Sequence, residues 1–319
     1  MLSLFLLPLF FAFASAANPP YGQLSVSGTK LKGSSGQDVA LHGMSLFWSN
    51  FGEGAPFYNA ATVKALKCKW NSNIVRAAMG VEGGYLNNPS QEQAKLEAVV
   101  QAAIAEGIYV IIDWHDHNAQ SHQSQAVSFF TAMSKKYGKN TNILYEIFNE
   151  PLQVDWNSVV KPYAQAVIKA IRANDAKNVI IVGTPTWSQD VDVAANSPIT
   201  GQKNIMYTLH YYAATHKQDL RNKLTTAVNK GLPVFVTEYG TVTADGNGYV
   251  DAAESKTWWN FLDGLKISYV NWAIDNKDEK SAALTPGTSS SQVGDSSRWT
   301  ESGKLVQAKL ASQKNGVSC

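Results

Sequence analysis

Short apolar runs recur along the chain, and segments with the 3.6-residue period of amphipathic helices lie between them. Successive runs start 26 to 36 residues apart. Runs that are apolar at nearly every position are typical of strands buried on both faces of a parallel sheet. The eight runs begin at Val39, Ile74, Tyr109, Ile143, Val179, Ile205, Val234 and Ser268.

Eight strands alternating with helices predict an α/β fold with one domain, a (β/α)8 TIM barrel, rather than an open doubly wound sheet. Gly107 and Gly231 fall where helix C-caps are expected. Residues 24–37 alternate and turn on glycines, which predicts a small N-terminal β-hairpin outside the barrel. The last helix is expected over residues 303–313, after a loop rich in serine and glycine at 285–298.

The first residues are almost wholly apolar and lead into a run of small residues, as in a secretory signal peptide. No Lys or Arg precedes this run, but it is too short to span a bilayer. We therefore expect cleavage after Ala16 or Ala17 and a secreted, extracellular protein without a membrane anchor. The expected divisions are a signal peptide at 1–17, a barrel domain at 18–314 and a short C-terminal tail at 315–319.

Composition and charge narrow the possible partners. The formal net charge is +2, which gives no electrostatic reason to expect nucleic acid or an acidic membrane as a partner. We expect a monomer. The two cysteines do not make a disulfide framework. Cys68 lies in a helical pattern and is expected to be a small buried hydrophobe, and a bridge to Cys319 is the less favoured alternative.

Two of the apolar runs end on a glutamate. Residues 143–151, ILYEIFNEP, place Glu150 just before a proline that must end the strand, and residues 234–240, VFVTEYG, place Glu238 at a second strand end. Each glutamate alone could be a solvated charge at a strand end. Two carboxylates raised at the same end of two strands are what cleavage of a glycosidic bond needs, namely a proton donor and a nucleophile.

Other polar and aromatic residues also lie at predicted strand ends. In a barrel of this type the active site is built at the C-terminal ends of the strands, so these positions are candidates even though each one alone could be a satisfied polar group of the core. They are Arg76, His115, Asn149, His210, Tyr212 and Trp272.

The motifs at these strand ends resemble, in the same order, those of glycoside hydrolase family 5, and are most similar to its endo-1,4-β-glucanase (cellulase) subfamily. The resemblance extends over residues 21–313. The motifs are LHGMS (41–45), NIVRAAM (73–79), IDWHDH (112–117), YEIFNEP (145–151), GTPTWSQDV (183–191), TLHYYA (208–213), FVTEYG (235–240) and NWAIDNKDEKSAAL (271–284).

This resemblance implies a role for each candidate. Glu150 would be the general acid/base, with a raised pKa, and Glu238 the nucleophile, which must stay ionised. Arg76 would hold Glu238 deprotonated, and Tyr212 would donate its hydroxyl to the same carboxylate. Asn149 would bond the sugar 2-hydroxyl. His115 and His210 would orient the carboxylates or bind sugar, Trp272 would form the platform under the sugar being cleaved, and neighbouring sugars would be bound by Trp48, Trp187, Lys277, Glu279, His42 and Tyr85.

His115, Asp116 and His117, with His122 nearby, are candidate metal ligands, but no further ligand has the spacing of a metal site. We expect neither a metal nor a cofactor. The sequence thus predicts a retaining endo-β-1,4-glucanase that binds cellulose or other β-1,4-glucan chains. Alternatives are a β-1,4-mannanase, a xylanase or a multi-substrate glycanase, and, from a different class, a glycan-binding barrel without catalysis.

Overall fold

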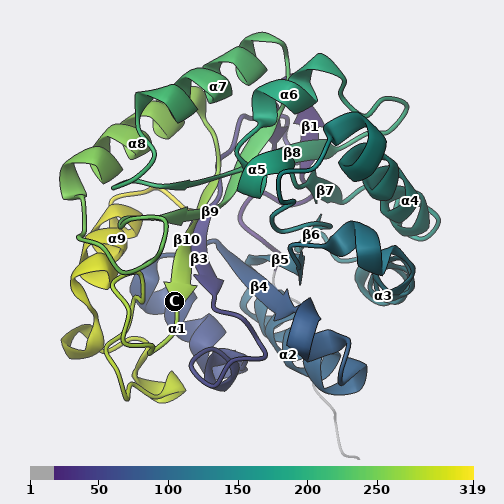
Figure 1. Cartoon of the computed structure of the whole chain (residues 1–319). Helices are drawn as coiled ribbons and strands as arrows, with labels where there is room; N and C mark the ends of the chain where they lie inside the picture. Colours follow the sequence, from purple (N-terminus) through teal and green to yellow (C-terminus); the bar gives the residue numbers. More distant parts are fainter. Residues whose placement is uncertain (1–17) are drawn as a thin grey trace, which may run out of the picture.

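A computed structural model describes residues 18–319; the predicted signal peptide, residues 1–17, lies outside the described residues. Eight parallel strands close into a barrel in the order β10-β3-β4-β5-β6-β7-β8-β9 (Figure 1), which confirms the predicted (β/α)8 fold. The strands are β3 (His42–Leu46), β4 (Ile74–Gly80), β5 (Tyr109–His115), β6 (Ile143–Glu146), β7 (Val179–Val182), β8 (Ile205–Tyr212), β9 (Val234–Gly240) and β10 (Tyr269–Ile274).

Helices surround the barrel on its outside (Figure 1). Within residues 18–319, none of them is long and apolar enough to cross a membrane. The α-helices are α1 (Ala60–Trp70), α2 (Pro89–Glu106), α3 (Gln123–Tyr137), α4 (Lys161–Arg172), α5 (Pro185–Ser188), α6 (Val191–Asn196), α7 (Gln218–Asn229), α8 (Ala252–Leu265) and α9 (Glu301–Ala311). Short 3₁₀ or π turns are η1 (Ala55–Phe57), η2 (Val81–Tyr85), η3 (Ala119–His122), η4 (Trp156–Val160), η5 (Ser290–Gln292) and η6 (Ser296–Arg298).

The barrel interior changes from apolar to polar along the strands. Near the N-terminal ends the interior is an apolar cluster that includes Ile111, Leu144 and Phe235. Two residues further along each of these strands, on the same face, stand Asp113, Glu146 and Thr237, all fully buried. The strands therefore support a buried polar layer on an apolar base, and this layer lies directly beneath the C-terminal end of the barrel.

A β-bulge in β9 places Glu238 on the inside of the barrel. Thr208 of β8 pairs with Phe235, but His210 pairs with Glu238, so β9 has one extra residue between the two pairs. Strict alternation from Phe235 and Thr237 would point Glu238 outward. The bulge reverses this, so that Thr237 and Glu238 both contact the buried polar groups at the barrel mouth.

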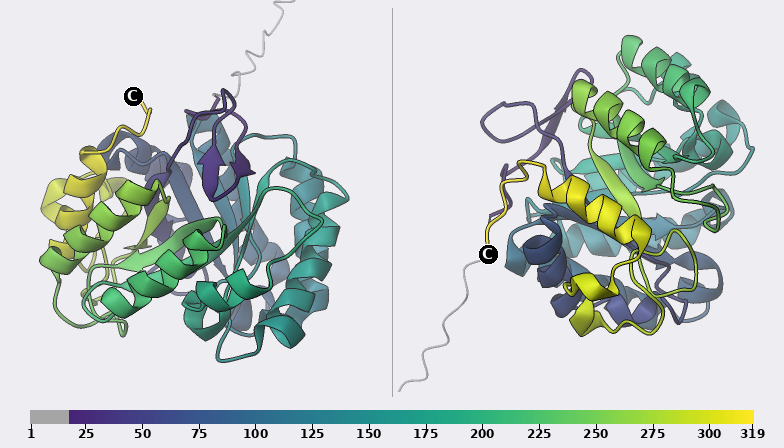
Figure 2. Two further views of the ribbon diagram at one scale, coloured as in Figure 1. Left: turned by 90° about the horizontal axis from the view of Figure 1, so that it is seen from above. Right: turned by 90° about the vertical axis from the view of Figure 1, so that its left-hand side faces the viewer.

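The predicted hairpin is present as β1 (Ser25–Ser27) and β2 (Lys30–Lys32), paired antiparallel. It lies at the same end of the barrel as the C-terminal segment (Figure 2, left). The first barrel strand was predicted to begin at Val39 but begins at His42. The reason is that the Val39 N–H donates to Leu31 O at 3.0 Å, so this part of the run continues the hairpin.

The C-terminal segment is fastened to the base of the barrel. Asn315 is buried; its side-chain amide donates to Asn71 O at 2.7 Å, and its Oδ1 lies 2.8 Å from His42 Nδ1. Beyond it, Cys319 forms a disulfide with Cys68 of α1. The expectation that Cys68 is a buried, free thiol was therefore wrong, because the chain after α9 returns to α1, a contact that residue patterns do not reveal.

Replacing Cys319 with serine is expected to lower the free energy of unfolding. The bridge joins residues 251 apart in the sequence, and a loop of that length restricts the unfolded chain by about 2–5 kcal/mol. Denaturant unfolding in non-reducing buffer measures the difference, and wild type with dithiothreitol should match the variant. Equal midpoints for variant and oxidised wild type would contradict the expectation.

Candidate active site

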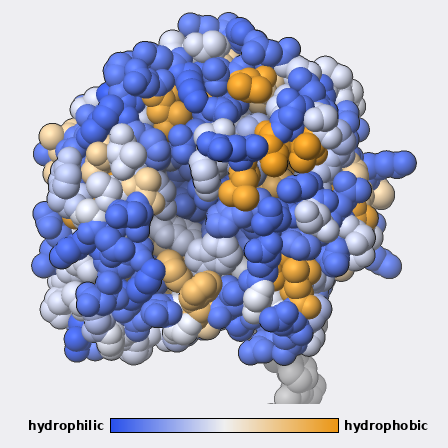
Figure 3. Space-filling model, viewed as in Figure 1, coloured by the Kyte–Doolittle hydropathy of each residue, from blue (hydrophilic) through white to orange (hydrophobic). Residues whose placement is uncertain are grey.

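Two carboxylates face each other at the C-terminal end of the barrel. Glu150 follows β6, and Glu238 lies near the end of β9 with 4 % of its surface exposed. One oxygen of each carboxylate and one ring nitrogen of His210 lie within 4.8 Å of one another. The surface at this end of the barrel is hollowed near its middle (Figure 3). The structure thus brings together the two glutamates that the sequence singled out.

Glu238 is held by two donors that fix both of its oxygens. Arg76 Nη1 donates to Oε2 at 2.9 Å, and the Tyr212 hydroxyl donates to Oε1 at 2.8 Å. Burial raises the pKa of Glu238, and the negative charge of Glu150 adds to that rise, whereas His210, Arg76 and Tyr212 act to lower it. The carboxylate is therefore oriented as a nucleophile requires, in a site where negative charge is concentrated.

Glu150 lies between two histidines. His210 Nδ1 is 2.9 Å from its Oε1, and His117 Nε2 is 3.2 Å from its Oε2. Burial acts to raise the pKa of Glu150, but the hydrogen bonds and charges of His117 and His210 outweigh burial and lower the pKa to about 2. His117 was quoted in a sequence motif but was not predicted as a site residue; the signal was its place just beyond the end of β5.

The pKa values of the two carboxyl groups lie in the reverse of the expected order, since the pKa of Glu150 is lowered and that of Glu238 is raised. His117 and His210 together account for the lowered pKa of Glu150, whereas burial and the charge of Glu150 account for the raised pKa of Glu238. Burial lowers the pKa of His210, but the surrounding carboxylates Glu238, Glu146 and Glu150 outweigh burial and raise it to about 9. At neutral pH the proton that a general acid needs is therefore held on His210, across a 2.9 Å contact from Glu150.

Stability should fall at alkaline pH because of His210. Its folded pKa of about 9 lies above the value of about 6.5 for an unfolded histidine. The stabilisation of the folded protein by protonated His210 is therefore complete below about pH 6.5. It is lost as the pH rises through 9, which lowers the free energy of unfolding by at most about 3 kcal/mol. Chemical denaturation at pH 6 and pH 10 measures the change, which should be smaller in His210→Gln. An equal change in both proteins would contradict the assignment.

Arg76 connects the two strands that carry the glutamates. It is fully buried, with Nη2 3.0 Å from Asp113 Oδ2 and Nε 2.7 Å from Glu146 Oε2, in addition to its bond to Glu238. Nη2 also donates to Asn149 Oδ1 at 2.6 Å. Burial acts to lower the pKa of Arg76, but the carboxylates more than compensate and raise it. Asp113 and Glu146 were not predicted as site residues, although alternation places them on the inner face with His115 and Glu150.

An aromatic wall lies beside the carboxylates. The Trp272 and His115 rings are parallel within 4° at a centroid distance of 5.1 Å, and Trp48 meets His115 edge-on at 4.1 Å. His115 Nδ1 is 2.7 Å from Asp113 Oδ2, and burial together with Arg76 lowers the pKa of His115 well below its usual value. Neutral His115 is thus held in place between Asp113, Trp272 and Trp48, and it fixes the two tryptophans that line the groove.

The groove extends to both sides of the glutamates. One side, a pocket of about 250 Å³, is lined by Trp187, Gln189 and His216. The other, of about 240 Å³, is lined by residues that include Phe47, Trp48, His115, Trp272, Lys277 and Glu279. Both pockets include Glu150, Tyr212 and Glu238. Lys277 forms an ion pair with Glu279. Gln189 and His216 were not predicted, because they follow strands by several residues.

Trp187 is presented by a strained turn. Thr186, Trp187 and Ser188 have φ of 59°, 53° and 56°, a left-handed conformation that disfavours residues with a side chain by about 1–2 kcal/mol each. The turn is held by the segment around Glu150, since the Trp187 N–H donates to Pro151 O at 2.8 Å and Ser188 Oγ to Asn149 O at 2.8 Å. Trp187, 40 % exposed, is therefore held next to the segment that carries Glu150.

Two predicted sugar-binding residues are not among those that line the two pockets beside the glutamates. His42 begins β3 at the opposite end of the barrel, where its ring lies 4.4 Å from that of Tyr269. Tyr85 packs against Trp114 and Phe129 at centroid distances of 5.0 and 5.5 Å. The prediction for His42 was wrong, because a position within a family-like motif does not distinguish the first residue of a strand from its last. Tyr85 is partly buried in η2, after β4, and its role stays a prediction.

The segment that holds the candidate metal ligands Asp116 and His122 forms a hydrogen-bonded cluster. Ligand atoms of Glu82, Asp116 and His122 lie within 4.8 Å of one another. Asp116 Oδ2 is 2.7 Å from His122 Nδ1 and 3.2 Å from Trp114 Nε1, and Oδ1 accepts from the Asn118 N–H at 2.9 Å. These bonds account for both oxygens of Asp116 without a cation.

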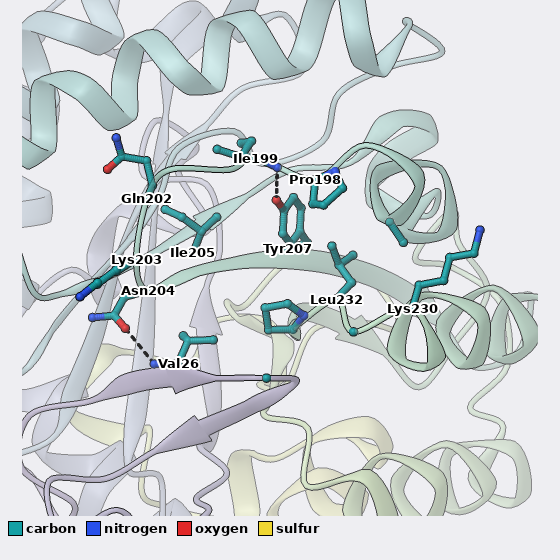
Figure 4. Close-up of a pocket in the computed structure, with 14 residues that line it drawn as sticks. Val26, Pro198, Ile199, Gln202, Lys203, Asn204, Ile205, Tyr207, Lys230 and Leu232 are labelled. Carbon is teal, nitrogen blue, oxygen red and sulfur yellow. Dashed lines mark hydrogen bonds between the residues drawn. The ribbon is translucent and has the colours of Figure 1, made fainter.

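A second hollow, of about 430 Å³, lies between the hairpin and the base of β8 (Figure 4). Tyr207 accepts the Ile199 N–H at 2.7 Å there, and Asn204 Oδ1 accepts the Val26 N–H at 2.9 Å. Its charged lining residues are lysines, and the lining includes no carboxylate or histidine. It therefore has no group that could transfer a proton or attack a sugar near neutral pH.

A (β/α)8 barrel that brings two glutamates together across an open groove of aromatic and polar side chains defines a glycoside hydrolase. Residues 33–278 match the cellulase family, glycosyl hydrolase family 5. The chain belongs to this family, which confirms the family predicted from the motifs.

Named relatives agree with this assignment. Endoglucanase Z of Dickeya dadantii (strain 3937) is 52 % identical over 293 residues, which are 91 % of this chain and 66 % of that protein. An endoglucanase of Clostridium saccharobutylicum is 46 % identical over 306 residues, 93 % of this chain and 67 % of that protein. This chain thus spans about two thirds of the length of these relatives.

Solved structures share the whole barrel. A Cytophaga hutchinsonii structure has a TM-score of 0.90 and 51 % identity and covers 93 % of this chain and 96 % of its own. The catalytic domain of Thermobifida fusca endoglucanase Cel5A, as a variant in complex with cellotetraose, has a TM-score of 0.86 and 33 % identity. It covers 92 % of this chain and 100 % of its own.

Proposed function

We propose that this protein is a secreted endo-β-1,4-glucanase that hydrolyses internal bonds of cellulose and soluble β-glucans with retention of configuration. The observation that carries the proposal is the approach of Glu150 and Glu238, with one oxygen of each within 4.8 Å. Retaining glycosidases hold these groups about 5–5.5 Å apart, whereas inverting ones separate them by about 6.5–9.5 Å. A groove open on both sides of the pair suits cleavage within a chain.

In the first step Glu238 attacks the anomeric carbon, the bond to the leaving oxygen breaks, and that oxygen receives a proton through Glu150. Glu150 takes this proton from His210 across their 2.9 Å contact, and the proton taken from water in the second step returns to His210 by the same route. The product is a glycosyl ester on Glu238. Esterification removes the negative charge of Glu238, which favours the ionised form of Glu150. Glu150 then accepts a proton from the water that hydrolyses the ester, and Glu238 is released as a carboxylate.

The neighbouring residues support these two steps. Arg76 and Tyr212 keep Glu238 oriented toward the groove. Asn149 Oδ1 is occupied by Arg76, which leaves the Asn149 amide N–H groups to donate to a sugar hydroxyl. Trp272 offers the stacking surface for the sugar at the cleaved bond, while Trp48, Lys277 and Glu279 line one side of the groove and Trp187 the other.

Hydrolysis of a panel of polysaccharides tests the function. Release of reducing ends from carboxymethyl cellulose is expected, with the β-anomer formed first as seen by NMR. Activity confined to β-1,4-mannan or xylan would support the alternative substrates. Binding to cellulose without any release would indicate a glycan-binding barrel, although both glutamates and their hydrogen-bond partners are in place.

Secretion is supported by the apolar N-terminal segment and by the disulfide between Cys68 and Cys319, since disulfides persist mainly in oxidising compartments. Mass spectrometry of protein recovered from the culture medium tests this proposal. An N-terminus at Ala17 or Asn18 would agree with removal of residues 1–16 or 1–17.

A further inference from the structure

Thr237 is a fully buried residue of β9 with three polar neighbours. Its Oγ1 lies 2.6 Å from Glu146 Oε1, 2.9 Å from His210 Nε2 and 2.5 Å from Thr208 Oγ1. The three contacts share one hydroxyl, which has one hydrogen to donate and two lone pairs to accept with. The direction of each bond can therefore be deduced.

Glu146 is ionised, because burial acts to raise its pKa but the charges of Arg76 and His210 more than compensate and lower it. An ionised carboxylate only accepts, so the Thr237 hydroxyl donates to Glu146. Thr208 Oγ1 accepts the Thr237 N–H at 3.2 Å and can use its own hydrogen toward Thr237 Oγ1. The remaining contact of Thr237 is with His210 Nε2, and in it Thr237 must accept. His210 therefore carries a hydrogen on Nε2.

We propose that Thr237 is a positioning residue that fixes the tautomer of His210, so that Nδ1 is the one ring nitrogen that exchanges a proton with Glu150. This inference rests on the proposed function. When Nε2 keeps its hydrogen, one further proton can lie either on Nδ1 or on Glu150 Oε1, which are in contact. In the other neutral tautomer, Nδ1–H would oppose a protonated Glu150, and the pair could not hold the acid proton.

Other charged groups also face His210, and their charges act on the hydrogen that is assigned to Nε2. They are Asp113 and His115 of β5, Glu146 of β6, Glu150 after it, and Glu238 of β9. Among the bonds described for residues 18–319, the one between Nε2 and Thr237 Oγ1 is the only one of Nε2 within hydrogen-bond distance; Glu146 Oε1 is 3.7 Å away. The Thr237 hydroxyl is thus the direct hydrogen-bond partner of Nε2, and the more distant Glu146 carboxylate also favours a hydrogen there.

Kinetics of Thr237→Val, which keeps the shape of the side chain but removes the hydroxyl, test the inference. We expect kcat/KM for cellotetraose to fall by about tenfold to a hundredfold. For 2,4-dinitrophenyl β-cellobioside, whose leaving group departs without protonation, kcat/KM should be unchanged. Thr237→Ser should retain most activity on both substrates. Thr62→Val, a fully buried threonine whose hydroxyl has no partner, is the matched control and should change neither value.

The tautomer can also be observed directly, without activity. In Glu150→Ala labelled with ¹⁵N-histidine, where the carboxylate that faces Nδ1 in wild type is removed, long-range ¹H–¹⁵N spectra above the pKa of His210 should show hydrogen on Nε2. Adding Thr237→Val should shift this hydrogen toward Nδ1, and His210→Gln assigns the signal. Hydrogen on Nδ1 of His210 in Glu150→Ala, or equal losses on both substrates in Thr237→Val, would overturn the inference. Wild type inactive on cellotetraose and on the aryl cellobioside would instead contradict the proposed function, and the spectra would still decide the tautomer.

Discussion

Replacing Glu238 with alanine is expected to reduce hydrolysis by at least about a thousandfold, because the proposed reaction loses the group that forms the covalent intermediate. Sodium azide should partly restore turnover of an activated aryl β-cellobioside. The anion can enter the space left by the carboxylate, next to Arg76 Nη1, and attack the anomeric carbon once. One displacement inverts the centre, so the product should be the α-glycosyl azide, identified by NMR.

The matched variant is Glu150→Ala, in which the nucleophile is intact. Here the glycosyl ester on Glu238 still forms from an activated substrate, and azide attacks it from the other face, so two displacements give the β-glycosyl azide. If instead Glu238→Ala gives the β-product and Glu150→Ala the α-product, the roles of the two glutamates are exchanged. Far-UV circular dichroism of both variants shows whether each is folded.

The repeat of apolar runs was sufficient to predict the barrel, because each strand of a closed parallel sheet is buried on both faces and needs no information from distant residues. The same logic placed His115, His210 and Tyr212 at or near strand ends that share one face of the molecule. Arg76 was also predicted at a strand end but is the third residue of β4, and its long side chain reaches Glu238 from there. Contacts that depend on the path of the chain between elements were not predictable in this way. The bridge between Cys68 and Cys319 is one such contact.

Thr237 and Glu238 could not both be assigned to the site from the sequence alone. Both residues were in a quoted motif, yet alternation assigns them to opposite faces of the strand. Only the bulge in β9 turns both toward the barrel interior. The order of the pKa values was likewise not predictable, since it depends on His117 and His210 approaching Glu150 from two other strands.

Replacing Arg76 with methionine is expected to have the largest effect on stability. The buried guanidinium contacts three carboxylates, those of Asp113, Glu146 and Glu238. Removing one partner of a buried ion pair typically lowers the free energy of unfolding by about 3–5 kcal/mol, a large part of the about 5–15 kcal/mol that a domain has. Hydrolysis should be lost as well, because Glu238 loses the cation that favours its ionised form.

Urea unfolding at pH 7 measures this loss, with Arg221→Met as the matched control. Arg221 is also buried but pairs with one carboxylate, that of Glu254, which is 18 % exposed at its side chain. Its replacement should lower the midpoint less and leave hydrolysis intact. The deficit of Arg76→Met should shrink as the pH falls, because protonation removes the repulsion among Asp113, Glu146 and Glu238. A midpoint equal to that of wild type at pH 7 would mean that the buried carboxyl groups are already neutral and that Arg76 does not hold Glu238 ionised.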